Sequence, residues 1–268
     1  MIVPAITNRM ASLQITVLGS GTSAGVPMIG CKCAVCTSTD PKDHRTRASI
    51  VVDYLGKRIL VDTTPELRLQ CVAHDVNWID AVVYTHAHAD HIMGLDDVRR
   101  FNAIRKGPLD MWADKVTFDM IDRAFGYAFQ PPDLAAKLFR PHLIRRYIEG
   151  PFEIEGVVWH PIPLIHGTMP VLGFRIGKFA YCTDVSHIPE PSFDLLEGLD
   201  LLIIDALAWH KHPTHFSIAE ALEVVDRVKP ARTLFTHIAH NVGHVETSAR
   251  LPAGVELAYD GQVAEAGL

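Results

Sequence analysis

Four side chains able to bind metal ions fall within six residues, in the segment His86-Ala-His88-Ala-Asp90-His91. The three histidines offer neutral imidazole nitrogens and Asp90 offers a hard anionic oxygen, a mixture that suits Zn²⁺, Mn²⁺ or Fe. One ion cannot easily accept all four, because in a tight loop the alternate pair His86 and His88 points away from the adjacent pair Asp90 and His91. The spacing therefore predicts two neighbouring ions. The alternative is a set of unrelated histidines beside a helix-capping Asp, which chance rarely assembles.

Three further candidate ligands lie far along the chain, each after an apolar, strand-like segment. His166 follows residues 163–165, Asp184 follows residues 179–183, and His237 follows residues 233–236. Taken alone, each could be a buried histidine or a turn aspartate. Together, they could complete a site for two ions.

Three of the five cysteines, Cys31, Cys33 and Cys36, lie in one short loop. An odd number of cysteines argues against a disulfide framework. Three thiolates need a fourth ligand to close a tetrahedral structural zinc site. His240, three residues beyond His237, is the candidate. Three buried free cysteines remain the alternative.

The spacing His86-x-His88-x-Asp90-His91 resembles the signature of the metallo-β-lactamase superfamily. This resemblance implies an α/β fold, the four-layer αβ/βα sandwich. It also implies that Asp184 bridges two ions whose other ligands come from separate loops. The implied ligands are His86, His88 and His166 for the first ion and Asp90, His91 and His237 for the second.

Within that superfamily, three segments resemble the PhnP phosphodiesterase family: the glycine-rich residues 18–27, the cysteine loop, and residues 236–240. The resemblance implies hydrolysis of small cyclic phosphodiesters, notably phosphoribosyl 1,2-cyclic phosphate. The PqqB family shares the thiol loop but typically lacks the full histidine motif, and RNase Z normally carries a long arm that is not found here. A thioesterase or lactonase, an RNase Z-like tRNA nuclease and a PqqB-like metal carrier remain alternatives.

The predicted enzyme uses two divalent ions, Zn²⁺ or Mn²⁺, to hold a bridging hydroxide that attacks the phosphorus, with a third, structural zinc elsewhere. The leaving alkoxide then needs a proton donor. His215 is the candidate, because it matches the position of a catalytic histidine in the PhnP family and precedes the capping box Ser217-x-x-Glu220. Asp90 and His215 are thus the predicted catalytic residues.

The composition limits the partners. The formal charge is −6 over 268 residues, which argues against a nucleic-acid polymer as partner, since phosphate backbones are bound mainly by clustered Lys and Arg. A small anionic phosphodiester remains the expected substrate. No apolar run approaches the length of a membrane span, so we expect no membrane partner and a cytoplasmic location. Homodimer formation is left open.

One hydrolase domain over residues 1–268 is expected, with residues 1–9 as a flexible extension. Hydrophobic patterning predicts strands and helices in alternation. Prolines at 131, 132 and 141 mark a less regular middle that could form a flap. The predicted strands are residues 13–18, 49–54, 57–62, 81–84, 156–160, 171–176, 178–182, 199–204 and 231–235. The predicted helices are residues 65–73, 96–105, 114–125 and 217–228.

Several further residues could support the site. Asp62 and Asp205 each end an apolar strand and could hold a ligand imidazole by its far nitrogen, or could simply cap a turn. Arg45, Arg47 and Arg99 could touch phosphate, but solvated surface arginines are the simpler interpretation.

Overall fold

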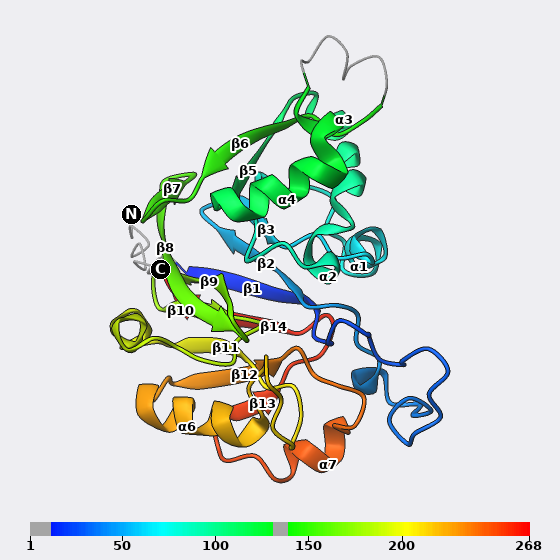
Figure 1. Ribbon diagram of the computed structural model, residues 1–268, viewed down its shortest axis with the longest axis vertical. Coiled ribbons are helices and arrows are strands. Elements are labelled where there is room, and N and C mark those ends of the chain that lie inside the picture. Colours follow the sequence, from blue (N-terminus) through cyan, green and yellow to red (C-terminus); the bar gives the residue numbers. More distant parts are fainter. Residues whose placement is uncertain (1–11, 131–138) are drawn as a thin grey trace, which may run out of the picture.

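The computed structural model describes residues 12–130 and 139–268. Two seven-stranded sheets lie face to face, with helices on their outer surfaces (Figure 1). The first sheet has the order β14-β1-β2-β3-β4-β5-β6, and the second has the order β13-β12-β11-β10-β9-β8-β7. The first sheet contains β1 (Ser12–Gly19), β2 (Ser49–Tyr54), β3 (Lys57–Val61), β4 (Ala81–Val83), β5 (Leu109–Ala113), β6 (Leu143–Tyr147) and β14 (Val263–Gly267). The second contains β7 (Phe152–Ile154), β8 (Val157–His166), β9 (Met169–Ile176), β10 (Phe179–Cys182), β11 (Leu201–Asp205), β12 (Arg232–Thr236) and β13 (Val255–Leu257).

Helices cover both outer faces. The first sheet carries α1 (Leu67–Ala73), α2 (Ala89–Ile92), α3 (Arg99–Arg105) and α4 (Lys115–Phe125); the second carries α6 (Ile218–Val228) and α7 (His244–Ser248). The α6 helix begins at a complete capping box, in which Ser217 and Glu220 satisfy each other's backbone N–H groups. Among the described residues, no helix is both long and apolar enough to span a bilayer.

Three apolar clusters separate the four layers. Val52, Trp159 and Phe174 belong to the cluster between the two sheets. Leu67 and Phe118 belong to the cluster between the first sheet and its helices. A third cluster packs α6 against the second sheet. The sequence-based prediction of a four-layer αβ/βα sandwich is confirmed.

Parallel pairing decides where the functional residues meet. Strands β3 to β6 run parallel, and so do strands β10 to β13. The carboxyl ends of neighbouring parallel strands lie at the same edge of a sheet. Residues that directly follow these strands are therefore brought together although they are distant in the chain.

The sequence predicted most element types but not all elements. The predicted helix at 96–105 is a 3₁₀ turn, η2 (Leu95–Val98), followed by α3, and the predicted strand at 156–160 extends to His166. The predicted helix at 65–73 begins two residues later, at Leu67. Strands β5, β6, β7, β13 and β14 were missed, because each has at most five residues and so carries little periodic pattern of its own. Residues 1–9 and the prolines at 131 and 132 lie outside the described residues.

Candidate metal centre and active site

The histidine motif occupies the turn that follows β4 and enters α2. His86 is buried and His88, the residue before α2, is exposed. Asp90 and His91 lie in the first turn of α2, with Asp90 half-buried and His91 buried. The ring centroids of His86 and His91 lie 4.2 Å apart, closer than the 4.7 Å between His86 and His88, so the turn brings the two pairs together rather than pointing them apart as the spacing had suggested.

Three other residues of the site follow strands in a left-handed backbone conformation. Asp62 after β3, Asp184 after β10 and His237 after β12 have φ values of 64°, 51° and 58°. Non-glycine residues adopt this region rarely, and it costs energy that the surrounding structure must offset. Here the conformation turns each side chain out of its strand at the carboxyl edge of its sheet.

The predicted ligands form two groups of four that share Asp184. Within each group, the potential ligand atoms lie within 4.8 Å of one another. The first group is His86, His88, His166 and Asp184, and the second is Asp90, His91, His237 and Asp184. The structure thus brings together the same residues that the resemblance had divided between two ions, and Asp184 is common to both groups.

Hydrogen bonds orient the imidazoles of the first group. His166 Nδ1 lies 2.6 Å from the carbonyl oxygen of Thr214 and donates to it. His86 Nδ1 lies 3.0 Å from Thr85 Oγ1, and that hydroxyl in turn donates to Asp62 at 2.8 Å. Both rings are thereby held in the tautomer that leaves Nε2 free to bind a metal ion.

In the second group, Asp62 holds His91. Its Oδ2 lies 2.8 Å from His91 Nδ1, and its Oδ1 accepts the backbone N–H of Thr85 at 2.9 Å. Of the two supporting roles considered for Asp62, the structure has the one in which it holds the far nitrogen of an imidazole. His237 lacks such a support, because its Nδ1 is 4.0 Å from Asp205 Oδ1, beyond hydrogen-bond length.

Burial and charge act in opposite directions on these groups. Burial lowers the pKa of His86 well below its ordinary value, which keeps that imidazole neutral and available as a ligand. Burial also works against charge on His91 and Asp184. The attraction of Asp184 and Asp62 outweighs it and raises the pKa of His91, and the attraction of His237 and His91 lowers the pKa of Asp184. Similarly, Asp184 and Asp90 overcome burial and raise the pKa of His237 to about 9.

The donor set fits divalent cations. His86 Nε2, His91 Nε2 and His237 Nε2 are buried without a hydrogen-bond partner among the described residues. The Nε2 atoms of His91 and His237 lie 3.3 and 3.4 Å from the oxygens of Asp184. Converging buried nitrogens and carboxylate oxygens are expensive to bury unless cations balance them. The fold and these clusters indicate divalent metal binding.

His215 lies beside both groups. Its ring centroid is 4.5 Å from that of His166 and 4.5 Å from that of His237. Its Nδ1 is bonded to Asp205 Oδ2 at 2.7 Å, so Nε2 remains free. The sequence left two roles open for Asp205, holding a ligand imidazole or capping a turn. In the structure its Oδ2 holds the predicted proton donor and also accepts the backbone N–H of Val185 at 2.9 Å.

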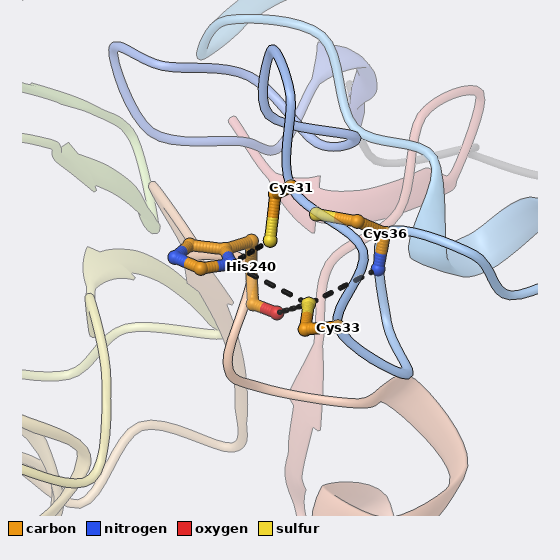
Figure 2. A group of neighbouring side chains, drawn as sticks. All are labelled: Cys31, Cys33, Cys36 and His240. Carbon is orange, nitrogen blue, oxygen red and sulfur yellow. Dashed lines mark hydrogen bonds between the residues drawn. The ribbon is translucent and has the colours of Figure 1, made fainter.

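The cysteine loop lies beside the segment that follows β12 (Figure 2). Cys31 Sγ and Cys33 Sγ lie 3.4 and 3.5 Å from His240 Nδ1, and the four ligand atoms of Cys31, Cys33, Cys36 and His240 lie within 4.8 Å of one another. The backbone N–H of Cys36 and the His240 ring lower the pKa of Cys33 to about 6. A thiol that ionises readily suits zinc ligation.

Of the three arginines, Arg45 departs from the expectation of a solvated surface group, whereas Arg47 and Arg99 are partly exposed. Arg45 is only 1% exposed and binds Asp43 at 3.1 Å, so the surface interpretation is wrong for this residue. Arg47 pairs with Glu66, and Arg99 pairs with Asp96. All three guanidinium groups thus have carboxylate partners within the chain.

Two contacts at the site were missed from sequence. Thr85 links His86 to Asp62, and its position directly before the motif was the only local signal. The carbonyl oxygen of Thr214 orients His166 from a position 48 residues away in the chain. Backbone acceptors leave no trace in residue type, so the sequence could not reveal this contact.

The family profile described as "Beta-lactamase superfamily domain" matches residues 57–238. Together with the two-sheet fold, this match shows that the chain belongs to the metallo-β-lactamase superfamily and has a hydrolase fold of that class. Within the superfamily, it belongs to the PhnP family. The crystal structure of "a New Diphosphatase from the PhnP Family" is 42% identical, with a TM-score of 0.89, and covers 96% of this chain and 99% of its own.

Other relatives are more distant or longer. The octanoyltransferase of Porphyromonas gingivalis is 34% identical over 253 residues, but the alignment covers 93% of this chain and 51% of that protein. The chain therefore spans about half the length of that relative. The structure of Zn²⁺-bound PqqB from Methylobacterium extorquens is 18% identical with a TM-score of 0.77, over 94% of this chain and 99% of that one. This last likeness concerns the fold alone.

Proposed function

We propose that this chain is a two-metal phosphodiesterase that cleaves small cyclic or simple phosphodiesters, of the phosphoribosyl cyclic phosphate type. The observation that carries the proposal is the pair of four-residue groups sharing Asp184, with His215 beside both. Two bound divalent ions would supply a hydroxide nucleophile at neutral pH and neutralise the phosphoryl oxygens. We propose Zn²⁺ or Mn²⁺ at this centre and a structural Zn²⁺ at Cys31, Cys33, Cys36 and His240.

The residues have distinct roles in this proposal. Asp62, Thr85 and the Thr214 carbonyl fix the imidazole ligands. Asp90 and Asp184 hold negative charge where the two cations would lie. His215 donates a proton from Nε2 to the leaving oxygen, while Asp205 holds its Nδ1–H.

A diphosphate is the second candidate substrate, because the 42% identical PhnP-family structure is that of a diphosphatase. Both substrate classes place a dianionic or monoanionic phosphoryl group between two cations, and they differ in the leaving group. An alkoxide is a poor leaving group and needs the proton that His215 supplies. A phosphate leaves more readily, so a diphosphatase would depend less on His215.

A substrate panel tests the proposal. The protein, loaded with Mn²⁺ or with Zn²⁺, is assayed with ribose cyclic phosphates, bis(p-nitrophenyl) phosphate and dinucleoside diphosphates. Octanoyl thioesters, lactones and precursor tRNA represent the alternative activities. Asp184→Ala provides the background rate. Preferential turnover of the cyclic diester supports the proposal, whereas preference for a diphosphate, thioester or tRNA assigns the corresponding alternative. No turnover with either metal would favour a carrier resembling PqqB.

A further inference from the structure

The carboxylate of Asp260, three residues after the end of β13, accepts four hydrogen bonds from two distant segments. Its Oδ1 accepts from Ser20 N at 2.9 Å and from Ser20 Oγ at 2.8 Å. Its Oδ2 accepts from Thr46 N at 2.8 Å and from Thr46 Oγ1 at 2.7 Å. Each carboxylate oxygen thus accepts one hydrogen bond from a backbone N–H and one from a hydroxyl. This arrangement ties the C-terminal part of the chain to the segments after β1 and before β2.

One arm of this network reaches His237. The backbone oxygen of Ser20 accepts the N–H of Ile238 at 2.9 Å, and Thr22 N donates to Ile238 O at 3.2 Å. Both peptide groups of Ile238 are therefore fixed by the segment that Asp260 holds. Ile238 directly follows His237, whose left-handed backbone must be maintained by its surroundings. Because His237 Nδ1 has no hydrogen-bond partner among the described residues, its backbone is what positions its ring.

A second arm reaches the loop that supports His91. Gln70 Nε2 donates to Thr46 Oγ1 at 2.8 Å, and Thr64 Oγ1 donates to Gln70 Oε1 at 2.9 Å. Thr64 lies two residues after Asp62, which holds His91. Between them, Thr63 N donates to the carbonyl oxygen of His91 at 2.7 Å.

The donors in the second arm all point toward Asp260. The Thr64 hydroxyl donates to Gln70, the Gln70 amide donates to Thr46, and the Thr46 hydroxyl donates to the carboxylate. Such chains polarise one another, so the carboxylate fixes the orientation of each member. The space above Gly19 is filled by this network, since a Cβ there would lie 2.5 Å from Gln70 Nε2 and 2.7 Å from Thr46 Oγ1.

We propose that Asp260 is a positioning residue for the second ion, because its two arms end beside His237 and His91, the two histidines of that group. The inference rests on the two-ion centre proposed above. Asp260 touches none of the predicted ligands and acts through Ser20 on one side and through Thr46 on the other. In the first group, the carbonyl oxygen of Thr214 holds His166 outside this network, and Thr85 holds His86. Thr85 also donates to Asp62, so His86 is linked to the second arm only through this additional residue.

Asp260→Asn tests this role with little change in shape. The amide nitrogen cannot accept from a backbone N–H, so either Ser20 N or Thr46 N loses its acceptor, and one arm must shift. Loss of an outer partner of a metal ligand typically weakens binding by about 10- to 100-fold. We expect the second ion to bind about tenfold more weakly in this variant, with the first ion and the cysteine-bound zinc changed by less than about threefold.

Thr46 supplies a second pair of variants, in case Asp260→Asn fails to fold. Thr46→Val removes the hydroxyl that joins Gln70 to Asp260 at nearly constant shape, whereas Thr46→Ser keeps it. Thr46→Val should weaken binding of the second ion, whereas Thr46→Ser should bind that ion as tightly as wild type does. Asp200→Asn is the matched control, because Asp200 likewise accepts a backbone N–H, from Gly267 at 3.0 Å, but lies outside both arms.

The measurement is stepwise metal affinity, independent of activity. Metal-depleted protein is titrated with Zn²⁺ by calorimetry, bound metal is counted by elemental analysis, and the Co²⁺ absorption spectrum reports the coordination of each ion. The inference is supported if Asp260→Asn and Thr46→Val each bind one catalytic ion more weakly than wild type does. Thr46→Ser and Asp200→Asn should bind both ions as wild type does. The inference is overturned if folded Asp260→Asn protein binds both catalytic ions as tightly as wild type does. It is also overturned if the variant loses affinity for both ions to the same extent. Fewer than two catalytic ions in wild type would instead reject the two-ion centre itself.

Discussion

His215 and Asp205 form a buried pair beside the candidate metal centre, with His215 Nδ1 2.7 Å from Asp205 Oδ2. The same carboxylate oxygen accepts the backbone N–H of Val185 at 2.9 Å, which fixes the carboxylate next to Asp184. Because Nδ1 is occupied by this bond, the ring can present only Nε2 to a substrate. The pair therefore gives His215 the tautomer and the direction that a proton donor needs.

Replacing His215 by Ala should separate substrates by their leaving groups. A positioned acid typically contributes about 10²- to 10⁴-fold when the leaving oxygen is a poor one such as a ribose hydroxyl, whereas p-nitrophenolate leaves without such help. We expect full metal content and a much larger loss of kcat on the ribose cyclic diester than on bis(p-nitrophenyl) phosphate. Steady-state kinetics on both substrates measure the difference. Equal losses on both would indicate a positioning role, and wild-type rates would remove His215 from the mechanism.

Asp184→Ala should abolish hydrolysis and release catalytic metal. Asp184 is the only residue that belongs to both ligand groups of the catalytic centre, and it lies within 3.3 and 3.4 Å of His91 and His237. Asp90→Ala should weaken mainly the second ion, since Asp90 belongs to one group. Metal content per protein, with the cysteine-bound zinc as internal reference, compares the two variants. Two catalytic equivalents retained in Asp184→Ala would contradict the bridging assignment.

Cys33→Ser should remove one zinc and lower the melting temperature. Closed zinc sites contribute directly to folding, and this site joins the cysteine loop to the segment that carries His237. Activity should fall secondarily. Thermal unfolding and elemental analysis are the measurements, with Cys71→Ser in α1 as the control, because Cys71 lies outside the cysteine loop. An unchanged zinc count in folded Cys33→Ser protein would rule the site out.

The contribution of the α6 capping box to the free energy of unfolding should depend on pH. Ser217 Oγ donates to Glu220 at 2.6 Å, and this hydrogen bond lowers the pKa of Glu220 despite some burial. A carboxyl whose pKa is lower in the folded state stabilises the fold fully above its unfolded pKa, and the contribution is lost as pH falls through the folded pKa. Glu220→Gln should thus be less stable than wild type at pH 7, with the difference vanishing in the acid range.

Thermal unfolding of both proteins at pH 7 and near pH 3.5 measures this dependence. Ser217→Ala should cost about 1 kcal/mol at neutral pH, as loss of an N-cap does. Glu223→Gln, on the exposed face of the same helix, is the control and should change little at either pH. A difference between Glu220→Gln and wild type that is the same at both pH values would contradict the linkage.

Much of the site could be predicted from the sequence, because several of its potential ligands are residues of metal-binding type that lie close together in the chain. His86, His88, Asp90 and His91 lie within one turn, and Cys31, Cys33 and Cys36 within one loop, so local geometry alone brings them together. The later ligands were recognisable because each comes at or just after the end of an apolar strand. Asp184 and His237 follow the parallel strands β10 and β12, whose carboxyl ends meet at one edge, whereas His166 ends the antiparallel strand β8.

Only the tertiary structure decided which residue forms a hydrogen bond to which functional side chain of the site. Asp205 binds His215 and not a ligand, Arg45 is buried against Asp43, and Asp260 accepts from Ser20 across 240 residues of chain. These contacts depend on the order of strands in the two sheets, which residue types do not encode locally. A ligand needs a particular chemical group, and this is visible in the sequence. A hydrogen-bonded support needs only an acceptor at the right place, and that place exists only once the sheets have assembled.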